Sequence, residues 1–127
     1  MLGGKNVAAA LAVSDLDRAR TFYEGTLGLA QLQEDPASIL YGSGTSMVLV
    51  YTSEYAGTNR ATAATWAVGD DFDAIVDDLR GKGVAFERYD DLPGVTREGD
   101  VHLIGDLKGV WLKEPDDNIL SLVSMAM

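Results

Sequence analysis

The chain has 127 residues, 46% of them apolar, which is enough for one compact domain with its own core. Twenty acidic residues against ten basic ones give a formal net charge of −10, and such a surface repels nucleic-acid phosphates and anionic lipid surfaces. Without cysteine, the chain has no disulfide, thiolate metal ligand or cysteine nucleophile. The longest apolar run near the start, Val7 to Val13, is about a third of the roughly 20 residues that a membrane span needs, and no basic leader precedes it. We therefore expect a cytoplasmic protein that binds neither nucleic acid nor membrane.

The first half of the chain is predicted to be βαβββ. Val7 to Val13 (VAAALAV) indicates a strand, and Ser14 and Asp15 are helix-capping residues. Apolar residues at helical spacing follow, and Gly28 is placed to end that helix. Short strands are then expected at 29–33, 38–41 and 46–51, separated by Asp-Pro and Gly-Ser-Gly turns.

The second half repeats this pattern. A strand at 62–68 and capping residues at 69–71 precede a helix with one apolar stripe, which ends at Gly83. Val13, Asp15 and Gly28 find their counterparts in Val68, Asp70 and Gly83, each 55 residues later. After the helix we expect an extended segment at 84–88, a loop rich in Asp, Gly and Pro, and strands at 101–105, 110–113 and 119–123. A single domain over 1–127 would then hold module 1 (about 5–51), a linker (about 52–61) and module 2 (about 62–124).

Two motifs carry a family resemblance. VSDLDRARTFYEGTLGL at 13–29 and GVWLKEPDDNILSL at 109–122 resemble the opening and closing signatures of the vicinal oxygen chelate superfamily, which includes glyoxalase I, bleomycin-resistance proteins and extradiol dioxygenases. The resemblance implies an α+β fold of two tandem βαβββ modules, whose curved mixed sheets surround a cleft. It also implies a homodimer, because a second subunit often completes that cleft. The fold alone assigns no reaction, since drug-binding proteins and metal enzymes share it.

Enzymes of this superfamily hold a divalent metal with His and Glu at four strand positions. Matched residue by residue, these positions are Ala8, Ala63, Ser121 and, by a weaker strand match, Val48. Only the serine offers an oxygen, and a neutral hydroxyl is a poor metal donor. The resemblance therefore implies a member with no metal and no cofactor.

Small residues dominate the strand positions that the resemblance places in the cleft. By alternation these are Ala8, Ala10, Ala12, Ala63, Thr65 and Ala67. Such a floor leaves space for a ligand, although a partner's loop or a larger side chain could equally fill it.

Four other residues are candidates for ligand contact. Tyr41 and Tyr51 lie in a region that commonly walls the ligand site in relatives, where an ordinary apolar layer is the competing interpretation. Trp111 faces the cleft only in one of two strand registers. His102, the single histidine, is expected to pack or to hydrogen-bond at a strand or loop edge, with proton transfer as an open alternative. Trp66 is expected in the core.

Two functions remain open at this stage. The first is a metal-free binding protein of the bleomycin-resistance type that sequesters a cationic or aromatic small molecule, which the acidic field favours when the molecule is cationic. The second is a lyase, isomerase or dioxygenase with a non-standard metal site or a metal-independent acid-base mechanism. The sequence identifies no catalytic residue for the second.

Overall fold

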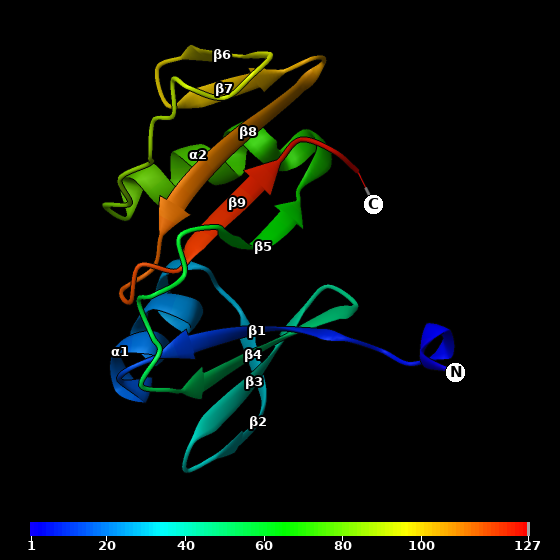
Figure 1. The fold of residues 1–127 in the computed structure, drawn as a ribbon, viewed down its shortest axis with the longest axis vertical. Coiled ribbons are helices and arrows are strands. Elements are labelled where there is room, and N and C mark those ends of the chain that lie inside the picture. Colours follow the sequence, from blue (N-terminus) through cyan, green and yellow to red (C-terminus); the bar gives the residue numbers. More distant parts are fainter. Residues whose placement is uncertain (127) are drawn as a thin grey trace. The chain divides into compact units, whose positions relative to one another are not determined.

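The computed structural model describes residues 1–126 and divides into two compact units. Unit 1 contains residues 1–63 together with 115–118, and unit 2 contains residues 64–114 and the chain from 119 onward. The short segment 115–118 thus comes from the second half of the sequence but packs with the first. Each unit has its own sheet and helix (Figure 1).

Unit 1 contains a four-stranded sheet in the order β1-β4-β3-β2. Its strands are β1 (Ala8–Val13), β2 (Ala30–Asp35), β3 (Ser38–Ser43) and β4 (Ser46–Thr52), and a short 3-10 helix, η1 (Leu2–Gly4), precedes them. β1 runs parallel to β4, while β3 is antiparallel to both β4 and β2. All four predicted strands of this half are confirmed.

The helix of unit 1 begins and ends where its sequence signals indicate. α1 (Leu16–Arg20) starts after Asp15, whose side chain accepts hydrogen bonds from the backbone nitrogens of Asp17 and Arg18. It continues as a π-helical turn, η2 (Thr21–Thr26), and stops at Gly28, which has a φ of 75°. This left-handed conformation favours glycine, so the predicted end of the helix is confirmed.

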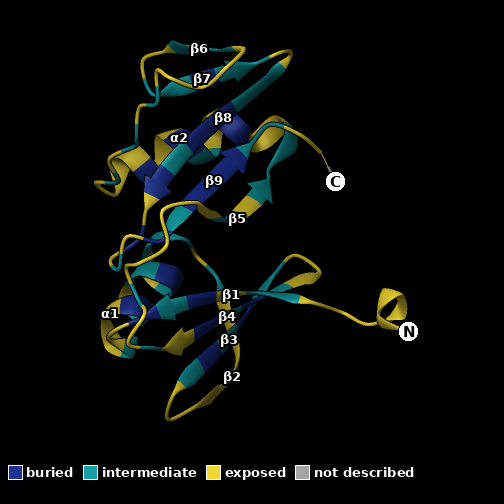
Figure 2. Ribbon diagram, viewed as in Figure 1, coloured by how far each residue is buried: buried dark blue, intermediate teal, exposed yellow. Residues whose placement is uncertain are grey.

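Strand alternation gives the sheet of unit 1 one packed face (Figure 2). Tyr23 of η2 stacks on Tyr41 of β3 with ring centroids 6.0 Å apart, which identifies this face as the one under the helix. Its side chains are almost completely buried: Leu11, Val13, Ile39, Tyr41, Val48 and Val50. Burial of each aliphatic side chain of this kind contributes about 1.5–3 kcal/mol.

Unit 2 contains a five-stranded sheet in the order β5-β9-β8-β7-β6. The strands are β5 (Thr62–Ala67), β6 (Val95–Glu98), β7 (Val101–Ile104), β8 (Leu107–Lys113) and β9 (Ile119–Val123). After β5, a 3-10 turn, η3 (Gly69–Asp71), leads into α2 (Phe72–Gly81), and Gly83 follows with a φ of 87°.

The segment between α2 and β7 differs from the prediction. Residues 84–88 form no strand, and only Phe86 pairs with the sheet, through a single bridge to Leu112. Instead, the expected loop contains β6, which forms a hairpin with β7 through a tight turn at Gly99, where φ is 61°. A Gly-Asp pair between alternating residues is a hairpin signal, but the Asp, Gly and Pro residues just before it obscured the strand.

The core of unit 2 lies between its sheet and α2. Lys108 of β8 reaches the helix, with its Nζ 2.9 Å from Asp73 Oδ1 and above the ring of Phe72. The strand residues on that face and the apolar stripe of the helix are buried: Val110, Leu112, Leu120, Leu122, Phe72, Val76 and Leu79. Trp66, expected in the core, is only half-buried. None of the helices within residues 1–126 has the length and apolar character needed to cross a membrane.

Candidate functional site

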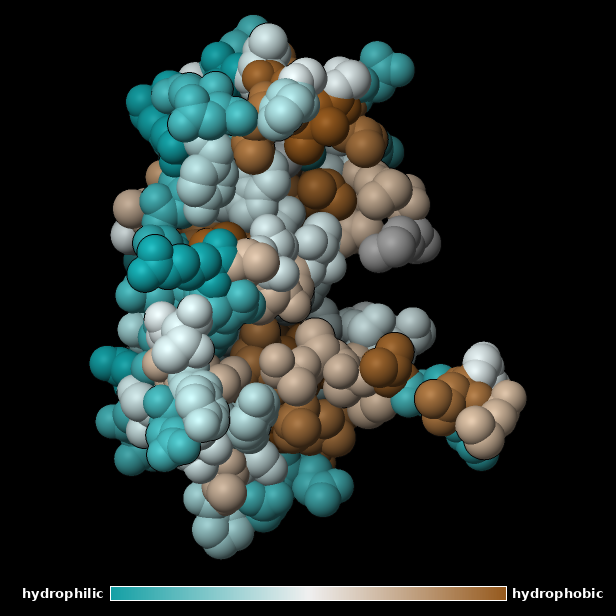
Figure 3. Space-filling model, viewed as in Figure 1, coloured by the Kyte–Doolittle hydropathy of each residue, from teal (hydrophilic) through white to brown (hydrophobic). Residues whose placement is uncertain are grey.

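In unit 1, the sheet face opposite α1 carries Ala8 and Ala10. Cross-strand pairing sets Ala8 against Met47 and Ala10 against Leu49, and Ala10 is exposed. Apolar side chains, brown and tan in Figure 3, gather over this part of the unit and the N-terminal segment. Tyr51, paired with Ala12, lies on the same face and is 37% exposed. Ala8, Ala10 and Tyr51 thus share one face.

Val48 and Tyr41 do not share that face, which corrects their assignment as ligand-contacting residues. Val48 pairs with Ala9 and with Tyr41, and both side chains are buried under the helix at 4% and 0% exposure. Val48 was selected by the weakest of the four strand matches, and a shift of one residue is enough to move a side chain to the opposite face of the sheet.

Tyr41 has a structural role instead. Its hydroxyl donates to Glu24 Oε2 at 2.9 Å, part way along the π-helical turn. Burial, together with the neighbouring Glu24 carboxylate, raises the pKa of Tyr41 far above its usual value. The phenol therefore stays protonated and ties the helix to β3.

In unit 2, the face opposite α2 brings together three of the predicted site residues. Trp111 of β8 pairs with Ser121 of β9, while Val110 and Leu112 face the helix, so the register that the sequence left open is decided. His102 of β7 pairs with Gly109, which lies on the same face as Trp111. The His102 and Trp111 rings are perpendicular, with centroids 4.7 Å apart.

His102 is fully buried at 0% exposure, in the packing and hydrogen-bonding role expected of it. Its Nε2 accepts a hydrogen bond from the backbone nitrogen of Tyr89 at 2.9 Å, and its Nδ1 is enclosed without a hydrogen-bond partner. The ring of Tyr89 also contacts Trp111 edge-on, at 5.4 Å between centroids. Sequence reasoning missed Tyr89, because nothing local links it to a strand 13 residues away.

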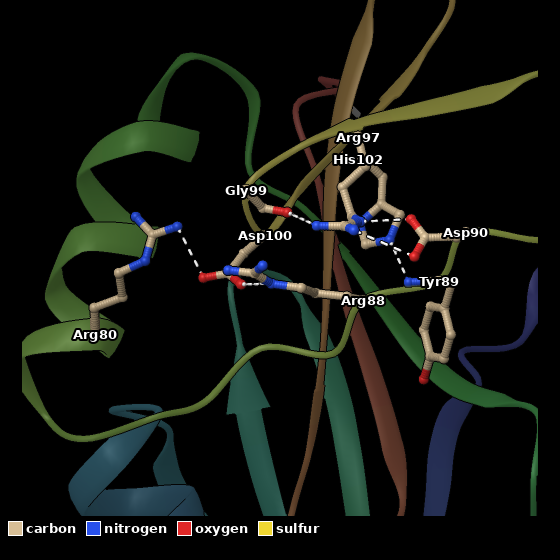
Figure 4. Close-up of polar contacts among 8 residues, drawn as sticks. All are labelled: Arg80, Arg88, Tyr89, Asp90, Arg97, Gly99, Asp100 and His102. Carbon is tan, nitrogen blue, oxygen red and sulfur yellow. Dashed lines mark hydrogen bonds and ion pairs between the residues drawn. The ribbon is translucent and has the colours of Figure 1, made fainter.

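Ion pairs fix the chain around this histidine (Figure 4). Asp90 accepts from Arg97 Nε at 2.8 Å, and Arg97 also donates to the carbonyl oxygen of Gly99. Asp100 lies between Arg88 and Arg80, at 2.9 and 3.2 Å. The hydrogen bond from Arg88 is the largest cause that holds the pKa of Asp100 below its usual value. These carboxylates are thus occupied in holding β6, β7 and α2 together.

The remaining predicted positions lie on β5, next to β9 in the sheet. Ala63 is half-buried and Thr65 is exposed. An open groove of about 510 Å³ lies elsewhere, in unit 1 beside the start of α1. Its lining includes none of the predicted site residues: Asp15, Leu16, Asp17, Arg20, Glu34, Asp35 and Pro36. Most of these side chains are charged, Leu16 and Pro36 are the apolar ones, and none is aromatic. We therefore take the open sheet face of each unit, considered separately, as a candidate site.

The residues present do not fit the divalent metal of the superfamily's enzymes. Two alanines occupy β1 and β5 positions, the β9 position is a buried serine, and Val48 points into the core. Across residues 1–126, no group of three or more His, Cys, Asp or Glu is arranged to hold a metal ion. A serine hydroxyl alone is too weak a donor set for such an ion.

Comparison with known proteins agrees with this fold. The family model of the Glyoxalase/Bleomycin resistance protein/Dioxygenase superfamily matches residues 6–119, and the chain belongs to this superfamily. No curated protein matches the sequence significantly. The predicted α+β class, with two curved mixed sheets and few helices, is confirmed.

Solved structures with this fold include proteins of different activities. A glyoxalase/bleomycin resistance protein/dioxygenase from Alicyclobacillus acidocaldarius is 21% identical, with a TM-score of 0.69 and coverage of 94% of this chain and 90% of that one. The fosfomycin resistance protein FosX from Mesorhizobium loti is 13% identical, with a TM-score of 0.69 and coverage of 98% and 94%. A lactoylglutathione lyase from Agrobacterium tumefaciens is 17% identical, with a TM-score of 0.68 and coverage of 94% and 92%. At these identities the likeness extends to the fold alone.

Proposed function

We propose that this chain is a small-molecule-binding member of the superfamily that works without a metal, sequestering its ligand. The observation that carries the proposal is the chemistry at the four positions where metal enzymes have His and Glu. Three of them are Ala8, Ala63 and Ser121, and the two alanines have no donor atom in their side chains. The fourth lies on β4 near the buried Val48, whose neighbours Met47 and Leu49 on the open face are also apolar. Losing every strong donor removes the superfamily's usual means of polarising a substrate but leaves the sheet faces able to bind one.

The sheet faces favour an aromatic molecule. In unit 2, the half-buried Trp111 offers part of its ring, and the hydroxyl of the buried Ser121 lies beside it. In unit 1, the small side chains of Ala8 and Ala10 leave room over the sheet. The net charge of −10 attracts a cationic molecule and raises its association rate more than its final affinity. We further propose that the protein is cytoplasmic and forms a homodimer. Sedimentation of the purified protein would test the dimer.

Metal analysis tests the proposal directly. Purified protein is assayed for bound divalent metal, and its melting temperature is measured with added Mn²⁺, Fe²⁺, Ni²⁺ or Zn²⁺. We expect no stoichiometric metal and no rise in melting temperature, because a ligand that binds only the native state would stabilise it. A stoichiometric ion that raises the melting temperature would instead favour the lyase, isomerase or dioxygenase alternative with a non-standard site.

A further inference from the structure

The backbone holds the single histidine of the chain in one tautomer. His102 Nε2 accepts the amide hydrogen of Tyr89 at 2.9 Å, so this nitrogen carries a lone pair (Figure 4). A neutral imidazole has one N–H and one acceptor nitrogen. The hydrogen therefore lies on Nδ1, and His102 presents Nδ1 as a donor.

That donor has no partner inside the protein. His102 Nδ1 is the one buried side-chain nitrogen or oxygen atom without a hydrogen bond in the described part of the chain. An unsatisfied buried donor costs about 1–3 kcal/mol, and native proteins keep few of them. The two nearby carboxylates that could accept from Nδ1 are engaged elsewhere. Asp90 pairs with Arg97, and Asp100 pairs with Arg88 and Arg80.

The surroundings of His102 suit a planar ligand. On the face opposite α2, His102 lies between two cross-strand neighbours, Gly109 of β8, which has no side chain, and Arg97 of β6. The side chains of Ile104 and Val123 lie over Gly109. The Trp111 ring stands perpendicular to the imidazole, and Ser121 lies opposite Trp111 on β9. One face thus combines an unused N–H, an aromatic surface and a hydroxyl.

We propose that His102 donates a hydrogen bond from Nδ1 to the molecule that this protein binds, which is therefore a planar aromatic bearing an acceptor. A carbonyl oxygen, a carboxylate or an unprotonated ring nitrogen provides that acceptor. The proposal rests on the proposed function and narrows the class of ligand. A cation that has only hydrogen-bond donors could not accept the hydrogen bond from Nδ1. Because Nδ1 is enclosed and the half-buried Trp111 packs on the imidazole, the proposal requires the Trp111 ring to move when the acceptor binds.

Nitrogen-15 NMR of histidine-labelled protein tests the proposal on the unmodified chain. His102 is the only histidine, so the imidazole signals belong to it alone. The probes are benzamide and benzoate, which carry acceptors, and benzylamine, which at neutral pH carries only donors. Binding itself is followed by the fluorescence of Trp111 in a Trp66→Phe background, since the chain has two tryptophans.

We expect the free protein to show the Nδ1–H tautomer, and benzamide and benzoate to move the Nδ1 proton downfield while benzylamine does not. If the acceptor probes bind without changing the Nδ1 signals, this inference is overturned and the proposed function stands. If no probe binds at millimolar concentration, the proposed function fails and the inference fails with it.

A variant gives an independent measurement. His102→Phe keeps a ring in this position and removes both nitrogens, so it should weaken benzamide about fivefold to tenfold relative to benzylamine, the worth of one hydrogen bond. The ratio within one variant cancels any general loss of stability. An unchanged ratio would contradict the proposal, and the NMR measurement decides the matter if the variant does not fold.

Discussion

The carboxylate of Asp116, in the turn between β8 and β9, accepts hydrogen bonds from both the backbone nitrogen and the hydroxyl of Ser14, 102 residues earlier in the chain. The hydroxyl bond is 2.6 Å long, and Arg18 Nη2 lies 2.9 Å from the same carboxylate. Two residues later, Asn118 Nδ2 donates to the carbonyl oxygen of Ala12 at 2.7 Å. The turn of the closing motif therefore belongs to unit 1 and fastens the junction between β1 and α1.

Removing this carboxylate should destabilise the protein. We expect Asp116→Ala to lower the free energy of unfolding by about 2 kcal/mol, because it removes charge-assisted hydrogen bonds from a largely buried group. Urea unfolding measures the change. Asp78→Ala is the matched control, since the exposed Asp78 side chain pairs with Lys82 and its removal should lower the free energy of unfolding by no more than about 0.5 kcal/mol. Equal losses in both variants would contradict the fastening role.

The same contact predicts a pH dependence. Burial opposes ionisation of Asp116, but the hydrogen bonds from Ser14 and Arg18 outweigh it and hold the pKa of this carboxyl below its usual value. A lowered folded-state pKa gives stability that is complete above the ordinary carboxyl range and is lost as the pH falls through the folded value. The stability difference between the wild type and Asp116→Asn should therefore be largest at pH 7 and shrink below about pH 4. A difference that is constant from pH 7 to pH 3 would show that the charge of Asp116 contributes nothing.

The backbone of Asp117 offers a stabilising substitution. Asp117 has a φ of 64°, the one described residue other than glycine with a positive φ. Asp117→Gly should raise the free energy of unfolding by about 1 kcal/mol, because glycine adopts this conformation without a Cβ clash. Gly105→Ala, in the β7–β8 turn at a φ of 59° with open space around a Cβ, should show the opposite sign. Both are measured by thermal unfolding, and a loss of stability in Asp117→Gly would show that its side chain matters more than its backbone.

Replacing small side chains on the open sheet faces by tryptophan should block ligand binding without unfolding the protein. Ala10 and Thr65 are exposed, so Ala10→Trp and Thr65→Trp place their rings outside either core. We expect near-native melting temperatures and loss of binding for compounds found in a thermal-shift screen of cationic and aromatic molecules. Unchanged affinity in both variants would exclude these strand positions from the ligand site.

The corrected position of Val48 has its own test. Val48→Ala should cost roughly 2 kcal/mol, because it opens a cavity under the helix of unit 1, and it should leave ligand affinity unchanged. Thr65→Ala, on the exposed side of β5, should change stability by less than about 0.5 kcal/mol. A reduced ligand affinity in Val48→Ala at unchanged stability would restore Val48 to the site.

Local chemistry made much of the fold predictable. The capping group of Asp15 and the positive φ values of Gly28 and Gly83 follow from short-range rules, and so did both ends of α1 with its π-helical turn and the C-terminal end of α2. The start of α2 differs, because the residues predicted to cap it form the 3-10 turn η3 and make no side-chain cap. Alternation also placed Leu11 and Val13 in the core. The β6 strand was missed because its hairpin lies in a stretch with loop-like composition, where pairing with β7 stabilises a strand that its own sequence only weakly favours.

The sequence by itself determined the duplicated pattern of strands and helices, the superfamily and the lack of strong metal donors at Ala8, Ala63 and Ser121, because these depend on residue identity and local spacing. Only the tertiary structure decided that Val48 and Tyr41 are buried, that Trp111, Ser121 and His102 share one face, and that Tyr89 fixes the tautomer of His102. Strand register reverses a side chain with a shift of one residue, and a contact between distant residues leaves no periodic trace in the chain.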